Sequence, residues 1–84
     1  MRQDEALGVL TDAFPGESVA VQVQLYRNVH GTEKRTGQRC TVFIGDVCIQ
    51  DQSIWKATVE AIIVARARIA AEAEKEPAHA DTIH

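Results

Sequence analysis

Residues 18–29 contain the pattern that most restricts the fold of this chain. Every second position carries an aliphatic side chain, namely Val19, Val21, Val23 and Leu25. The positions between them carry Ala20, Gln22, Gln24 and Tyr26. A period of two predicts a β-strand with one face in the core and one face in water, which is typical of antiparallel sheets. We therefore expect an antiparallel sheet whose second face is open.

Two glycine-containing segments predict how this strand connects to others. Residues 31–37 are polar and begin and end with glycine, which predicts a hairpin loop before a second strand over residues 38–44. Gly45-Asp46 then predicts a type II′ turn, because glycine comes first in the pair. A third strand follows over residues 47–50.

The Gly45-Asp46 turn has an alternative interpretation. A glycine within a strand also marks a β-bulge, in which case residues 38–50 form one kinked strand. The turn, by contrast, places Ile44 opposite Val47 and puts Cys40 and Cys48 on opposite faces of the sheet. Thiols on opposite faces do not meet the geometry of a disulfide, so we expect both cysteines to be free.

Helical spacing predicts a short helix over residues 4–14. Asp4 is the expected N-terminal cap, and Pro15 follows the last turn. The residues expected to face the core are Leu7, Leu10 and Phe14.

A longer helix is predicted over residues 53–75. Ser53 or Asp51 is the expected cap, Pro77 the expected end, and residues 78–84 an expected loose tail. One stripe of this helix is expected to face the core: Ile54, Thr58, Ala61, Ile62, Ala65 and Ile69.

The elements follow the order α-β-β-β-α in a single α+β domain over residues 1–77. A short N-terminal and a long C-terminal helix are expected to cover one face of a three-stranded antiparallel sheet. Over residues 4–70 this order resembles the double-stranded RNA-binding domain. That family has a lysine-rich start to its second helix, whereas residues 53–57 contain one lysine. Because duplex RNA affinity rests mainly on phosphate and 2′-hydroxyl contacts, we do not expect this activity.

Positive charge is concentrated in one segment. The chain carries a net charge of −3. Residues 27–39 contain four basic side chains against only Glu33, so the rest of the chain is acidic. A basic β-hairpin can contact nucleic acid or an acidic protein surface, while the simpler interpretation is a solvated loop. The candidate binding residues are Arg27, Lys34, Arg35 and Arg39.

The long helix has more apolar residues than one sheet can bury. A set that we call the helix flank lies outside the expected core stripe and consists of Trp55, Val59, Ile63 and Arg66. We expect this flank to pack against a second copy in a homodimer. The alternative is that the first helix covers Ile63.

Motifs for catalysis and metal binding are absent from the sequence. The chain has no phosphate-binding glycine loop, no HExxH, no nucleophile elbow and no CxxC. His30 is expected to be a surface residue, and the cysteines and histidines lack zinc-site spacing. We therefore expect no enzyme, no catalytic residue, no metal and no cofactor. The N-terminal residues lack a signal-peptide core and no run is apolar enough for a membrane span, which predicts a cytoplasmic protein without membrane contact.

These observations favour a small non-enzymatic binding module that docks on another protein. A chain of 84 residues has little apolar material left for a deep pocket but can present a docking surface. Phage-encoded inhibitors of host defence complexes are one class with these properties, although no motif identifies such an inhibitor. Two alternatives are a nucleic-acid-binding domain that uses residues 27–39, and a small oligomeric enzyme or ligand-binding subunit with a site between protomers.

Overall fold

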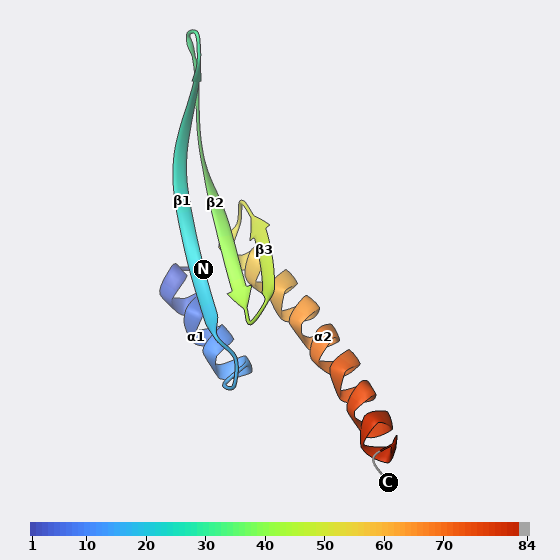
Figure 1. Cartoon of the computed structure of the whole chain (residues 1–84). Coiled ribbons are helices and arrows are strands. Elements are labelled where there is room, and N and C mark those ends of the chain that lie inside the picture. Colours follow the sequence, from blue (N-terminus) through green and yellow to red (C-terminus); the bar gives the residue numbers. More distant parts are fainter. Residues whose placement is uncertain (83–84) are drawn as a thin grey trace.

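The computed structural model describes the backbone of residues 1–82 and the side chains of residues 1–74. It confirms the predicted α+β class and element order (Figure 1). The elements are α1 (Gln3–Ala13), β1 (Val19–His30), β2 (Glu33–Ile44), β3 (Val47–Asp51) and α2 (Ile54–Thr82).

The three strands form an antiparallel sheet in the order β1-β2-β3. Ile44 pairs with Val47, so the loop between β2 and β3 has only two residues. Gly45 has a φ of 58°, and no non-glycine residue in the described chain has a positive φ. This combination is that of a type II′ turn, and the alternative of one strand bulged at Gly45 is wrong.

The connection between β1 and β2 is much tighter than the sequence suggested. Only Gly31 and Thr32 form the turn, because His30 pairs with Glu33 and the pairing continues without a break to Val19 and Ile44. The hairpin loop predicted over residues 31–37 is therefore wrong, since residues 33–37 belong to β2. A strand whose two faces are both in water has no hydrophobic alternation, so its side chains resemble those of a loop.

Helix α1 begins one residue before the predicted start. Asp4 lies within its first turn and does not cap it; the cap position is Arg2, which makes no side-chain cap hydrogen bond. Arg2 instead pairs with Asp4 and Glu5, at 3.0 and 3.3 Å. Leu10 and Phe14 are buried as expected, but Leu7 is 41% exposed.

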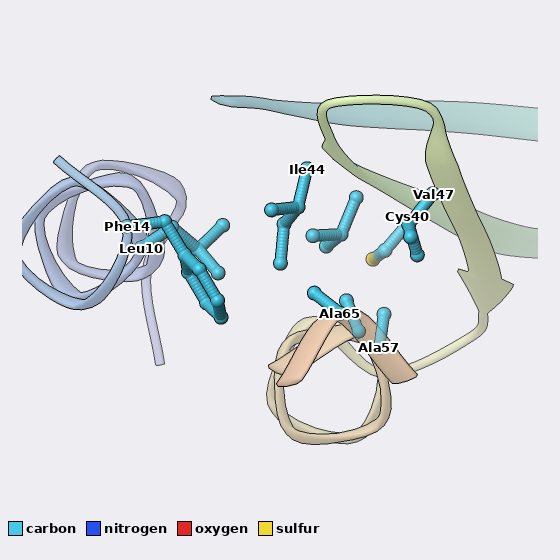
Figure 2. Packing of buried hydrophobic residues seen from close by; sticks show 9 residues of the cluster. Leu10, Phe14, Cys40, Ile44, Val47, Ala57 and Ala65 are labelled. Carbon is cyan, nitrogen blue, oxygen red and sulfur yellow. The ribbon is translucent and has the colours of Figure 1, made fainter. Parts of the chain in front are cut away.

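Helix α2 contacts the sheet through small side chains. The fully or almost fully buried residues of its inner face are Ala57, Thr58, Ala61 and Ala65. Figure 2 shows Ala57 and Ala65 directed toward the same space as Leu10, Phe14, Cys40 and Ile44. The larger residues of the predicted stripe lie at its margin: Ile54 and Ile62 are partly buried, and Ile69 is 44% exposed. Ile69 was thus wrongly predicted as core.

The two ends of α2 differ in how well the sequence predicted them. Ser53 Oγ accepts the Lys56 backbone N–H at 3.3 Å, which confirms Ser53 as a cap. At the other end α2 continues to Thr82, so the predicted end at Pro77 is wrong and residues 78–82 are helical. A proline removes one helical hydrogen bond, and a helix can continue past it with a kink. Residues 83–84 of the expected tail lie outside the described residues.

Candidate interaction surfaces

The hairpin formed by β1 and β2 extends beyond the rest of the sheet. Asp51, the last residue of β3, pairs with Cys40, so the part of the hairpin formed by residues 25–38 has only two strands. We call this part the β-arm. Figure 1 shows it projecting away from both helices. At its base, Gln38 Nε2 donates a hydrogen bond to the Gln52 carbonyl oxygen at 2.9 Å.

One face of the β-arm continues the helix-covered face of the sheet but lies beyond the helices. Leu25 and Val29 are on this face, because alternate residues of β1 share the face of Val21. Leu25 is 77% exposed and Val29 is 51% exposed. Aliphatic side chains on the core face of a strand are thus left in water.

The structure divides the four predicted basic residues between the two faces of the hairpin. Arg27 and Lys34 share the face of Leu25, whereas Arg35 and Arg39 lie on the open face. All four are exposed, and none forms an ion pair with any residue of the described chain. The cluster seen in the sequence is therefore two smaller basic patches.

The open face of the β-arm contains a close contact that the sequence did not reveal. Tyr26 pairs with Gly37, and a Cβ atom built on Gly37 would lie 2.6 Å from Tyr26 Oη. The Tyr26 ring therefore occupies the space that a side chain at position 37 would fill. No signal in the sequence indicated this contact, because Gly37 ends a polar segment that resembles a loop.

The helix flank is exposed along most of its length. Ile63 is 63% exposed and Trp55 is 56% exposed, while Val59 is partly buried and Arg66 is exposed. The alternative in which α1 covers Ile63 is therefore wrong. Helix α2 thus presents large apolar side chains on the side that the sheet does not cover.

Among the side chains that the structure describes, the chemically reactive ones do not converge on a site. His30 lies at the tip of the β-arm, opposite Glu33 and exposed. Cys40 is buried and Cys48 is exposed, and both thiols are free. Burial raises the pKa of the Cys40 thiol, and the nearby Asp51 carboxylate raises it further. Within the described residues no three histidine, cysteine or acidic side chains are grouped so that they could hold a metal ion.

None of the helices in the described part of the chain is long and apolar enough to cross a membrane. Comparison with protein-family models, with characterised proteins and with solved structures finds no match to this chain.

Proposed function

We propose that this chain is a non-enzymatic docking protein that binds another protein through its β-arm. The observation that carries the proposal is the 77% exposure of Leu25 together with Val29 on the same face of a two-stranded ribbon. A two-stranded ribbon without a covering layer is only marginally stable in water. A partner that covers this face would bury both aliphatic side chains and hold the ribbon in place.

The charge of the β-arm favours an acidic partner surface. Arg27 lies between Leu25 and Val29 on β1, and Lys34 pairs with Val29 across the ribbon. Cations beside apolar side chains are typical of a docking surface, in which the apolar residues supply affinity and the charges orient the partner.

A protein partner fits these observations better than a nucleic acid. The basic residues are split between two faces, so neither face carries the continuous basic stripe that contacts a phosphate backbone. The remaining chain is acidic and would repel nucleic acid.

The proposal is tested by capture with matched variants. Wild-type protein is immobilised and exposed to nuclease-treated lysate of the native cells, next to the variants Leu25→Glu and Leu7→Glu. Leu7 is also exposed but lies on α1, so it is a control for an added negative charge elsewhere. We expect a partner protein that the wild type and Leu7→Glu retain and Leu25→Glu loses, and purified partner should reproduce this pattern.

Two results would contradict the proposal. One is a partner that binds Leu25→Glu as strongly as it binds the wild type. The other is retention that occurs only in lysate left untreated with nuclease and that is lost when Lys34 and Arg35 are replaced with alanine, which would support the nucleic-acid alternative.

A second candidate function is self-association through the helix flank. The exposure of Ile63 and Trp55 on one side of α2 favours it, because large apolar residues on that side of a helix usually have a neighbour. The flank and the β-arm are separate surfaces, so a homodimer would still present two arms to a partner.

A further inference from the structure

Within the β-arm, the edge of β2 that faces away from β1 is unpaired in the described structure. It borders the position that β3 would occupy if β3 were longer. Ile44 and Val47 close a two-residue hairpin, so even-numbered residues of β2 direct their backbone N–H and C=O groups toward β3. From Arg39 back to Glu33, no strand of the described residues pairs with this side of β2. Lys34 and Thr36 therefore direct their backbone groups to the position that a longer β3 would occupy.

Cations flank this edge on both faces of the ribbon. Lys34 is on the helix side, and its neighbour Arg35 is on the open side, as is Arg39 nearer the body. All three are exposed. A strand placed along the edge would have side chains on both of its faces, and each face would lie beside a cation.

The outer edge of β1 is also unpaired within the β-arm, but it does not carry cations on both faces. At its start Gln3 of α1 donates a hydrogen bond from Nε2 to the Val21 carbonyl oxygen at 2.9 Å, so part of that edge is already used. Farther along, its side chains are largely apolar or uncharged, with Arg27 as its cation. Only β2 combines an unpaired backbone edge with cations on both faces of the ribbon.

We propose that residues 34–38 of β2 bind an extended acidic segment of the partner protein, which adds to the sheet as a strand in line with β3. This inference rests on the proposed docking function and names the chemistry of the segment that docks. In strand addition, backbone hydrogen bonds provide much of the affinity and side chains provide the selectivity. A second copy of the same edge is a poor occupant, because its cations would face those of the first.

Charge on an edge strand also has a protective role, since lysines prevent edges of identical chains from pairing. The two roles differ in a measurable way. A protective charge needs no ligand, whereas a docking edge binds an acidic strand and depends on the outward N–H groups.

The test uses a defined probe. A capped, fluorescently labelled ten-residue peptide of valine and threonine carries two adjacent glutamates, which place carboxylates on both faces of a strand. Control peptides have lysines in place of the glutamates, or N-methyl groups on alternate amides that block edge pairing. Fluorescence anisotropy should show saturable binding of the acidic peptide and at least tenfold weaker binding of both controls.

Variants of the protein separate backbone pairing from charge. Thr36→Pro removes an outward N–H without changing charge, and an edge strand tolerates proline. Val19→Pro removes an outward N–H from the outer edge of β1 at the first residue of that strand, outside the β-arm, and is the control. We expect Thr36→Pro to weaken binding at least about fivefold, as for the loss of one hydrogen bond. Val19→Pro should stay within about twofold of wild type, which is the precision of such comparisons. Circular dichroism checks that both variants fold.

The proposal is overturned if the acidic peptide does not bind, if the lysine or N-methylated peptide binds equally well, or if Thr36→Pro and Val19→Pro behave alike. It is also overturned if a DNA duplex displaces the peptide and binds the wild type and Thr36→Pro equally well. Any of these results leaves the docking function standing as long as Leu25→Glu still abolishes partner capture. If Leu25→Glu has no effect on capture, the docking function itself fails.

Discussion

Two leucines allow the exposure of the β-arm to be measured through folding stability. Leu10 of α1 is 0% exposed and belongs to the core, whereas Leu25 of the β-arm is 77% exposed. Leu→Ala at a buried site removes the transfer free energy of the side chain and leaves a cavity, at a cost of about 3 kcal/mol. Only about a quarter of Leu25 is covered. Its replacement by alanine should therefore cost roughly 0.5 kcal/mol, from about 2 kcal/mol for a fully buried leucine.

Urea unfolding followed by circular dichroism at 222 nm distinguishes these two costs. With a slope of about 1 kcal/mol per molar urea, Leu10→Ala should lower the midpoint by about 3 M and Leu25→Ala by about 0.5 M. In thermal unfolding the corresponding decreases are about 15 °C and about 3 °C. A wild-type stability of roughly 4–12 kcal/mol is expected for this length, so Leu10→Ala should remain measurable.

Equal losses for the two variants would refute the reasoning. They would mean that Leu25 is buried in solution, either because the β-arm folds onto the helices or because a second copy covers it. Repeating the measurement over a range of protein concentrations separates these causes, since stability from self-association rises with concentration.

Three further predictions concern the turn, the cysteines and the helix flank. Gly45→Ala should destabilise the fold by about 1–2 kcal/mol because the φ of residue 45 is positive, and Gly45→Asn should destabilise it by less. Equal midpoints of thermal unfolding for wild type and Gly45→Ala would contradict this prediction. In the native protein Cys48 should react rapidly with a thiol reagent and Cys40 only after unfolding, because Cys40 is buried and its pKa is raised. Two rapidly reacting thiols would show that Cys40 is accessible. No reactive thiol in the unfolded, unreduced monomer would show a disulfide. Light scattering should give twice the 9.2 kDa chain mass for the wild type and a folded monomer for Val59→Glu with Ile63→Glu. A wild-type monomer would remove the homodimer, and an unfolded double variant would place the flank in the core.

The raised pKa of Cys40 also fixes the direction of one pH effect. A thiol whose pKa is higher in the folded than in the unfolded state stabilises the fold while it stays protonated. Stability from this source is complete below the unfolded-state pKa of the thiol and is lost as the pH rises through the higher folded-state pKa. Replacing Cys40 with serine should remove this loss at alkaline pH, at the cost of a weaker core.

Several features of the fold were determined by local sequence alone. The alternation from Val19 to Leu25 determined which residues of β1 share the covered face, because side chains of a strand alternate regardless of context. The pair Gly45-Asp46 determined a two-residue turn, since glycine readily adopts the positive φ that this position requires. Gly31-Thr32 is the same kind of pair, and its signal was available but was masked by the charged residues that follow.

Other features depended on the tertiary structure. Whether residues 33–37 are loop or strand depended on their pairing with β1, because hydropathy does not distinguish a strand exposed on both faces from a loop. The separation of Arg27 and Lys34 from Arg35 and Arg39 followed from that pairing, and with it the basic edge of the β-arm.

The core face of α2 shows the same division between sequence and structure. Helical periodicity placed Thr58, Ala61 and Ala65 on the inner side, and the structure confirms their burial. It also left Ile63 outside the core stripe, in agreement with its 63% exposure, but it wrongly placed Ile69, which is 44% exposed, on the stripe. A helix that meets a sheet through alanines lies close to it, and the sheet is too short and narrow to cover the larger residues on its sides and beyond its end. The sequence determined which residues point in one direction, and the extent of the opposing surface, which only the tertiary structure decides, determined which of them are buried.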